Sequence, residues 1–292
     1  MDDKDWLAQR FEQHRTRLRA VAYRMLGSLP DADEAVQDAW LRLSRAGAEG
    51  VENLGGWLTT IVARVCLNAL QARKVRPDQP AGLRMPDPVV SREDQTDPEH
   101  EALLADSVGL ALLVVLETLD PAERLAFVLH DMFDLPFEEI APMVGRSPTA
   151  ARQLASRARR RVQGASMPPL ERDVARQREV VDAFFTAGRA GDFDALVRVL
   201  DPEVVLRSDL PKVGEQRGAT RVARLARAGA RTSASVLPVL VNGTAGAVIV
   251  EDGRATSVMG FTVSGGRIVE IDVVTDPGRL SQLGLDLASL RS

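Results

Sequence analysis

Residues 1–76 show the spacing of apolar side chains that is typical of packed α-helices. Apolar residues recur three and four positions apart, as in the run Leu18, Val21, Ala22, Met25 and Leu26. Gly27 to Pro30 interrupts this run, and Asp31 to Asp33 are suited to cap a second helix. A third helix is expected from about Leu54 to Ala72. The pattern predicts an all-α N-terminal domain.

Residues 77–98 are interpreted as a linker, because repeated prolines among acidic residues prevent a continuous helix. Helical periodicity resumes at Glu99. Asp120-Pro121 then combines a good cap residue with the residue favoured at the first helical position, and this helix should end near Phe133.

A helix-turn-helix follows directly. Pro136 to Ala141 predicts a short helix, Gly145 a turn, and Ser147-Pro148 the cap of a helix that continues to about Val162. Together with the preceding helices, it forms a second all-α domain over residues 99–164.

Beyond Met167-Pro168-Pro169, helices are followed by strands, which predicts an α+β domain over residues 171–292 with a curled antiparallel sheet. The expected helices are Val174 to Ala187, ended by Gly188, then Phe193 to Leu200 and Ala219 to Ala230. The expected strands are Val204 to Leu206, Val236 to Val241, Ala247 to Glu251, Thr256 to Val263 and Ile268 to Val274. Asn242-Gly243, Asp252-Gly253 and Gly265-Gly266 separate the last four as hairpin turns.

Composition narrows the class of protein. No apolar run approaches the length of a membrane span, and the acidic start of the chain is unlike a secretory signal, so a cytoplasmic location is expected. The single Cys66 cannot form an intramolecular disulfide, and no Cys or His cluster offers a zinc site. We therefore expect no metal and no cofactor.

The net charge of −4 does not indicate nucleic-acid binding, but the charges are unevenly distributed. Six arginines and no acidic residue lie between residues 146 and 161. The second helix of a helix-turn-helix enters the major groove of DNA, where such side chains reach bases and phosphates. The candidates on it are Thr149, Arg152, Gln153, Ser156, Arg157, Arg160 and Arg161. The alternative is a basic face that is only solvated.

The second all-α domain resembles region four of sigma-seventy-type factors, which reads the minus-thirty-five promoter element. The resemblance lies in Leu119 to Arg124, Phe137 to Ala141 and Arg152 to Arg159. This unit alone could also occur in a LuxR-type activator. The sequence of the N-terminal domain is therefore needed to distinguish a sigma factor from such an activator. Ala22 to Gly27 and Asp31 to Leu43 resemble region two of sigma factors of the extracytoplasmic-function (ECF) class. The resemblance implies that core RNA polymerase binds Asp33, Glu34, Gln37, Asp38 and Leu41.

Trp57 to Asn68 resembles the segment of these factors that opens and reads the minus-ten element. By that resemblance Arg64, Asn68 and Arg73 would contact the DNA strand. Cys66 is most simply interpreted as a small buried residue.

The linker and the tail resemble those of sigma factors that carry a SnoaL-like (NTF2-like) C-terminal domain. Arg84 to Val89 is similar to their linker motif, and Asp276 to Leu280 to their terminal motif. The resemblance implies that the tail docks on the sigma domains and modulates them. The residues expected to take part are Pro86, Asp87, Pro88, Asp209, Lys212, Asp276, Pro277 and Leu280. Asp209 to Lys212 lacks the glycines usual in that loop, so its geometry is open.

Two other functions remain possible on the sequence. One is a helix-turn-helix regulator with a ligand-binding tail, and the other is a SnoaL-type enzyme fused to a DNA-binding module. Acid-base catalysis in SnoaL-like folds uses Asp or His, and all three histidines, His14, His100 and His130, precede the tail. Asp209 with Lys212, Arg207, Asp272 and Arg224 could still line a pocket, but an ion pair is the commoner arrangement. The sequence thus favours an ECF sigma factor that binds core RNA polymerase and promoter DNA and is not an enzyme.

Overall fold

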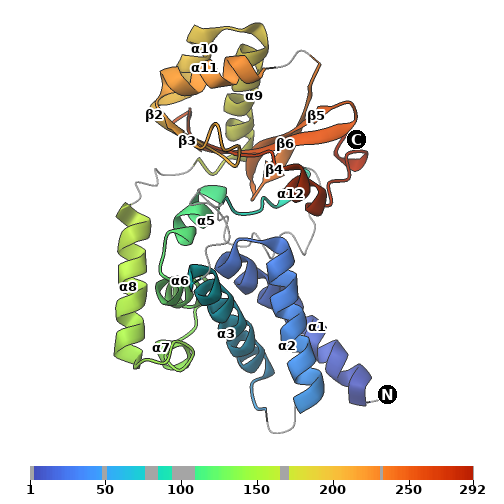
Figure 1. The fold of residues 1–292 in the computed structure, drawn as a ribbon, viewed down its shortest axis with the longest axis vertical. Helices are drawn as coiled ribbons and strands as arrows, with labels where there is room; N and C mark the ends of the chain where they lie inside the picture. The colour runs from blue at the N-terminus through green and yellow to red at the C-terminus, as the bar shows by residue number, and fades with distance from the viewer. Residues whose placement is uncertain are drawn as a thin grey trace. The chain divides into compact units, whose positions relative to one another are not determined.

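A computed structural model describes residues 3–47, 51–75, 85–93, 109–164, 171–230 and 233–291. The chain divides into two compact units (Figure 1). The first comprises residues 1–80, 98–106 and 115–165, and the second comprises residues 81–97, 107–114 and 166–292. The interval between the two helical domains is thus shared between the units, whereas the tail lies wholly in the second.

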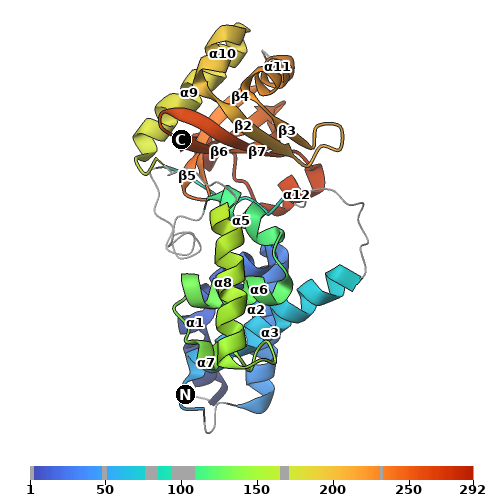
Figure 2. The same ribbon diagram turned by 90° about the vertical axis from the view of Figure 1, so that its left-hand side faces the viewer.

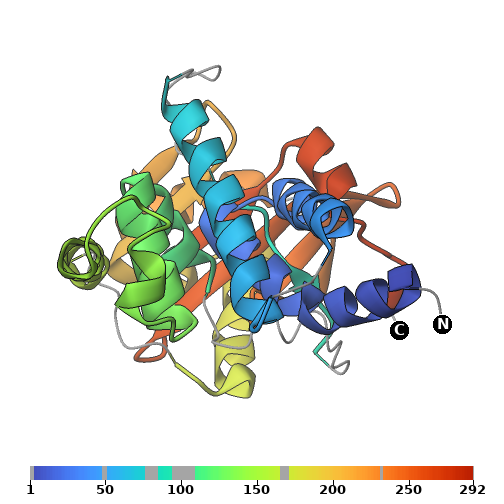
Figure 3. The same ribbon diagram turned by 90° about the horizontal axis from the view of Figure 1, so that it is seen from below.

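Three helices form the beginning of the first unit: α1 (Asp3–Leu26), α2 (Leu29–Ala46) and α3 (Leu54–Val75), which cross one another in Figure 3. Their mutual contacts bury Leu18, Met25, Leu43, Leu58 and Val62 almost completely. The expectation that Asp31 to Asp33 cap the second helix was wrong. Ser28 is the cap, and its side chain accepts a hydrogen bond from the Asp31 N–H at 3.4 Å. The helix begins before Asp31 because its first turn can contain Pro30, since proline is tolerated there.

The helix-turn-helix part follows α5 (Leu110–Glu117). It contains α6 (Pro121–Phe127), a π-helical turn at Val128–Met132, α7 (Phe137–Ile140) and α8 (Pro148–Gly164) (Figure 2). The expected cap is confirmed, since the Asp120 carboxylate accepts from the Ala122 N–H at 3.2 Å. The helix predicted from Glu99 lies partly outside the described residues.

A seven-stranded sheet forms the body of the second unit, in the order β1-β4-β5-β6-β7-β2-β3. Its strands are β1 (Val90–Ser91), β2 (Leu200–Ser208), β3 (Glu215–Arg217), β4 (Ser235–Val241), β5 (Thr244–Glu251), β6 (Arg254–Ser264) and β7 (Arg267–Val274). The three predicted hairpin turns are present, with positive φ at both central residues of each.

The prediction of a purely antiparallel sheet was wrong, because β2 pairs with β7 in parallel. The chain between them makes an excursion through β3, a helix and three further strands, so β2 and β7 are not joined by a tight turn. The tail sequence also did not reveal β3, and residues 77–98, interpreted as a linker, contain β1.

Helices α9 (Val174–Ala190), α10 (Phe193–Val199) and α11 (Ala219–Gly229) cover one face of this sheet, while α12 (Pro277–Gln282) lies on the other side (Figures 1 and 2). Val181, Phe184, Leu196, Val222 and Phe261 belong to the core between helices and sheet. The expected end of α9 at Gly188 was wrong. Gly191 ends the helix, because it is the glycine whose φ of 67° provides the left-handed cap.

The fold class is confirmed: two all-α domains precede an α+β domain. Among the helices that the structure describes, none is long and apolar enough to cross a membrane.

Candidate functional sites

The outer face of α2 carries the residues expected to bind polymerase. Glu34 and Gln37 are exposed, and Leu41 is exposed to 39%, unusual for a large apolar side chain. Asp33 is bound by Arg19, whose Nε donates to the carboxylate at 2.6 Å, and Asp38 lies 3.8 Å from Arg42. α2 therefore combines an acidic, amide-bearing ridge with an exposed leucine, a surface suited to a basic partner.

The residues expected to read the minus-ten element do not share one environment. Arg64 and Asn68 are exposed and lie one turn apart on α3. Arg73 instead pairs with Asp31 and donates to the Leu26 carbonyl at 3.4 Å. Arg73 thus holds α3 against α1 and α2. Arg64 donates to the Pro142 carbonyl at 3.5 Å, but it and Asn68 stay exposed.

Contacts join the three-helix part to the helix-turn-helix part within the first unit. Arg124, 2% exposed, donates from Nε to the Arg24 carbonyl at 3.1 Å and pairs with Glu117 at 2.9 Å. Burial lowers the pKa of Arg124, and Glu117 opposes that effect. Two further contacts lie closer to the surface: Lys74 binds the Asp120 carboxylate at 2.9 Å, and Arg17 donates to the Phe133 carbonyl at 3.0 Å.

α8 is held in the first unit by the buried alanines of its inner face and by two of its arginines. Ala151, Ala155 and Ala158 are fully buried. Arg157 and Arg161 both reach the buried Glu123 carboxylate, at 3.5 and 3.0 Å. The expected DNA-reading set therefore includes two arginines that also anchor the helix to α6.

The remaining members of that set differ in their surroundings. Arg152 stacks over the Phe137 ring with its guanidinium carbon 5.3 Å from the ring centre. Thr149, Gln153 and Arg160 are exposed, and Ser156 is half-buried. Arg152, Arg157 and Arg161 are exposed as well, so all of the expected set except Ser156 lies on the accessible surface of α8.

The segment 85–93 is held by the tail. Arg279, on α12, donates to the Asp87 carboxylate at 2.8 and 3.1 Å and to the Met85 carbonyl at 2.8 Å. The same guanidinium lies 3.5 Å from Asp209. Asp209 also accepts from Thr275 Oγ1 at 2.7 Å and from the Thr275 N–H at 2.8 Å. We call this group of Asp87, Asp209 and Arg279 the clasp.

Two further interactions extend the clasp along the segment. β1 adds to the edge of the sheet, where Val90 pairs with Val241. The side-chain oxygen of Asn242 accepts from the Val89 N–H at 3.1 Å, and the backbone N–H of Asn242 donates to the Val89 carbonyl at 2.8 Å. Pro86 and Pro88 are buried, and Glu93 pairs with Arg178 on α9. The segment is therefore an integral part of the second unit.

Of the other residues expected to mediate regulation, Asp276 caps α12 by accepting from the Arg279 N–H at 2.8 Å, Pro277 is the first residue of that helix, and Leu280 is buried. Lys212 is exposed and lies outside the clasp. Sequence reasoning did not single out Arg279 or Asn242, although Arg279 occupies the basic position of the terminal motif.

A second buried ionic group lies on the sheet. Arg207 contacts Asp272 at 3.4 Å, Glu270 at 3.1 Å and Glu215 at 3.5 Å. Burial raises the pKa of Asp272 to about 7, against the opposing effect of Arg207. Asp209 is bound in the clasp, and Arg207 pairs with Asp272, which is the ion-pair arrangement that the sequence left as the commoner alternative.

Comparisons with known proteins agree with this architecture. Residues 10–76 match the model of sigma-70 region 2, and residues 109–162 match that of sigma-70 region 4. The ECF RNA polymerase sigma factor SigJ of Mycobacterium tuberculosis is 36% identical, over 93% of this chain and 92% of its own length. The probable ECF RNA polymerase sigma factor SigI of the same species is 32% identical, over 98% of this chain and 99% of its own length.

The crystal structure of the M. tuberculosis SigJ factor has the same fold along nearly its whole length. It superposes with a TM-score of 0.75 at 35% identity, covering 94% of this chain and 98% of that chain. With both sigma regions matched and whole-length relatives of this kind, the chain belongs to the ECF RNA polymerase sigma factors of the sigma-70 family, which direct promoter-specific transcription initiation.

Proposed function

We propose that the tail of this sigma factor regulates initiation by holding the segment that connects region 2 to region 4. The observation that carries the proposal is the clasp, in which Arg279 binds both the carboxylate of Asp87 and the carbonyl of Met85. The domain boundaries at residues 76, 98, 164 and 171 belong to this proposal.

The length of the connecting chain shows how strongly the held segment restricts the movement of region 2. An extended chain spans at most about 3.5 Å per residue, so the ten steps from Val75 to Met85 reach roughly 35 Å. If the whole segment 85–93 were released from the tail, the chain from Val75 to Gly109 could extend to roughly 120 Å on the same estimate. Holding the segment therefore limits how far region 2 can move from the tail. It also limits the separation between promoter elements that regions 2 and 4 can span together.

The assignments to polymerase and DNA are part of the same proposal. Core polymerase contacts the α2 ridge of Glu34, Gln37 and Leu41, with Asp33 and Asp38 at its edge. Arg64 and Asn68 contact the minus-ten strand, and α8 contacts the minus-thirty-five element. The protein works in the cytoplasm, where it meets RNA polymerase.

We further propose that the tail is not catalytic. The SnoaL-type enzymes considered above need a carboxylate or imidazole that can exchange a proton with a substrate. Asp272 has a suitable pKa, but Arg207 and the neighbouring Glu270 enclose it on the sheet. Asp209 is engaged by Thr275 and Arg279.

The test is transcription in vitro with core RNA polymerase on promoters whose two elements are separated by different spacer lengths. Four proteins are compared: the full chain, a chain ending at Gly164, Arg279→Gln, and Arg254→Gln as a matched control on an exposed arginine of β6. We expect the full chain and the control to accept a narrow range of spacers, and the other two a wider range. Identical spacer profiles for all four would show that the tail does not act through the clasp. Absence of polymerase binding by every protein would contradict the polymerase assignment.

A further inference from the structure

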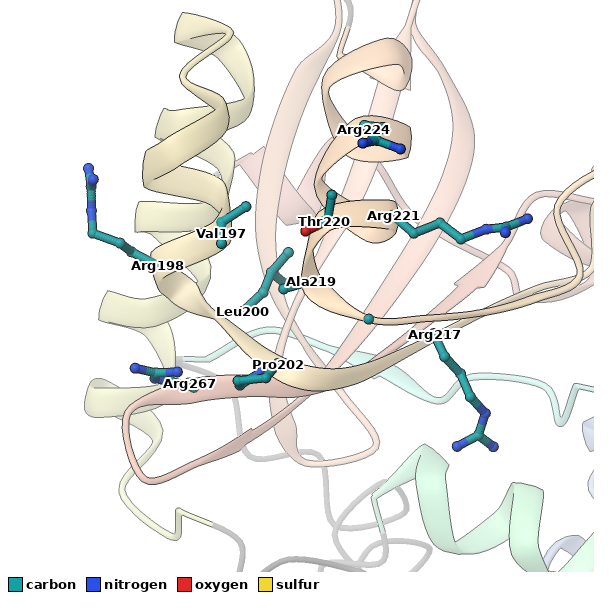
Figure 4. A pocket seen from close by; sticks show the side chains of 11 residues that line it. Val197, Arg198, Leu200, Pro202, Arg217, Ala219, Thr220, Arg221, Arg224 and Arg267 are labelled. Carbon is teal, nitrogen blue, oxygen red and sulfur yellow. The ribbon is translucent and has the colours of Figure 1, made fainter.

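The tail contains an open cleft that none of the functions above uses. It has a volume of about 700 Å³ and lies between the end of α10, the start of β2 and the first turns of α11. Figure 4 shows the apolar side chains of Val197, Leu200 and Ala219 gathered in its middle. Leu200 is fully buried and Ala219 is 8% exposed, so these residues form an apolar floor.

Five exposed arginines belong to the lining around this floor, and Figure 4 shows the side chains of Arg198, Arg217 and Arg221 extending outward from it. They come from separate elements: Arg198 from α10, Arg217 from β3, Arg221 and Arg224 from α11, and Arg267 from β7 (Figure 4). Among the described residues that line the cleft, none is acidic. Arg217 pairs with Glu215 at 2.9 Å, whereas the other four make no ion pair with any described residue.

Other exposed arginines of the tail, such as Arg189 on α9 and Arg254 on β6, also make no ion pair with a described residue, but the cleft brings four of this kind into one lining. Arg176, Arg178, Arg207 and Arg279 each have a carboxylate partner, and Arg227 stacks on Phe193. Four exposed arginines without an ion pair, in a lining with no acidic residue, give the cleft a positive potential that favours a bound anion. A cleft of this kind is therefore matched to a negatively charged ligand.

The backbone adds donors in the same place. α11 is capped by Gly218, with a φ of 90°, and no side chain accepts from its first N–H groups. Thr220 lies in that first turn and lines the cleft. The backbone N–H groups at the start of α11 add hydrogen-bond donors to those of the arginines, on which the proposed site mainly depends.

We infer that this cleft binds a small organic anion that carries phosphate groups and an apolar or ring portion. Arginine favours phosphate because its planar guanidinium can donate two parallel hydrogen bonds. The apolar floor provides a surface for the remainder of the ligand, which free phosphate would leave unused. The lining contains no His, Cys, Asp or Glu, so the cleft is a binding site and not a catalytic one.

The test measures binding directly and does not depend on how the tail regulates transcription. Titration calorimetry on the full chain uses three probes: ADP, inorganic pyrophosphate and adenosine. We expect ADP to bind most tightly, pyrophosphate more weakly because it cannot use the floor, and adenosine not at all.

Two variants localise the site. Arg221→Gln with Arg224→Gln should weaken ADP binding by roughly a hundredfold or more, because two charge-assisted hydrogen bonds are lost. Arg189→Gln with Arg254→Gln removes the same charge from exposed arginines outside the cleft and should leave the affinity within about twofold.

Thr220→Glu separates binding from folding. A carboxylate in the first turn of α11 interacts favourably with the helix dipole, so this variant should keep or raise the melting temperature while it abolishes ADP binding. The inference is overturned if no phosphate-bearing probe binds the full chain, or if ADP binding survives in Thr220→Glu. Binding of duplex DNA, and of none of the small probes, through Arg221 and Arg224 would also overturn it, in favour of a surface for the DNA backbone.

Discussion

Asp272 is a carboxylate whose burial sets a pH dependence for the tail. Burial raises its pKa from 3.8 to about 7, with Arg207 opposing the shift and Glu270 and Glu215 adding to it. The folded state therefore keeps this proton to a higher pH than the unfolded chain does. The stabilising effect is complete below about pH 4 and is lost as the pH rises through 7.

The first prediction follows from that sign. Asp272→Asn keeps the shape of the side chain and removes its titration, so thermal unfolding of the tail should change less between pH 5 and pH 8 than in the parent protein. Because one pKa unit corresponds to about 1.4 kcal/mol, the difference should be clear in melting curves. Asp194→Asn, on the exposed surface of α10, is the control and should follow the parent. An unchanged pH profile in Asp272→Asn would show that Asp272 titrates near its ordinary value.

Cys66 reports on the packing of region 2. It is fully buried on α3, and burial raises the pKa of its thiol to about 12. Since the thiolate is the reactive form, we predict that iodoacetamide labels the native protein at pH 8 far more slowly than the urea-unfolded protein. Cys66→Ala with Ser44→Cys, which places a thiol at an exposed position of α2, should react quickly in both states. Rapid labelling of native Cys66 would contradict the packing of α3.

At the scale of elements, α9 offers a matched pair of glycines. Gly188 lies inside the helix with open space around its missing Cβ, whereas Gly191 has a left-handed φ of 67°. We predict that Gly188→Ala stabilises the protein by about 0.5–1 kcal/mol and that Gly191→Ala destabilises it by about 1 kcal/mol. Urea unfolding of both variants checks the prediction. Equal effects of the two substitutions would place the helix end elsewhere.

At the scale of the whole molecule, the proposed function requires the packing of region 2 against region 4 to be reversible. Promoter elements near positions −10 and −35 are separated by about 25 base pairs, or roughly 85 Å at 3.4 Å per base pair. Helices joined by Lys74 with Asp120 and by Arg17 with the Phe133 carbonyl cannot reach both elements at once. On the proposed function, we therefore expect binding of core polymerase to break these contacts.

This leads to the fourth prediction. Fluorescent dyes at positions 44 and 163, both exposed, in a Cys66→Ala background should show high energy transfer in the free protein and a large decrease when core polymerase binds. Lys74→Ala with Arg17→Ala should lower the transfer in the free protein, because two of the contacts are lost. Transfer that stays high in the polymerase complex would show that the regions do not separate.

Much of the fold was predictable because its signals are local. Asp120 as a cap, the turns at Asn242-Gly243 and Asp252-Gly253, and the buried row of alanines on α8 depend on residues only a few positions apart. The errors lie where neighbouring positions offer equivalent choices. Ser28 and Asp31 can both cap a helix, and Gly188 and Gly191 can both end one, so packing has to decide between them.

The candidate sites were predictable only in part. The exposed residues of α2 and the arginine row of α8 are visible as sequence patterns, but the pairing of Arg73 with Asp31, and of Arg157 and Arg161 with Glu123, is not. Long arginine side chains reach partners on other elements, so one pattern can describe either a DNA contact or an anchor.

By itself, the sequence determined the family, the order of the helices and strands other than β1 and β3, and the candidate surfaces of regions 2 and 4. The physical reason is that helix periodicity, caps and tight turns depend on near neighbours. Only the tertiary structure decided that β2 runs parallel to β7, that residues 85–93 belong to the tail, and that Arg279 is the centre of the clasp. Arg279 and Asp87 are 192 residues apart, and no local preference encodes a contact over that separation. The same holds for the arginine-rimmed cleft, which α10, β3, α11 and β7 form together.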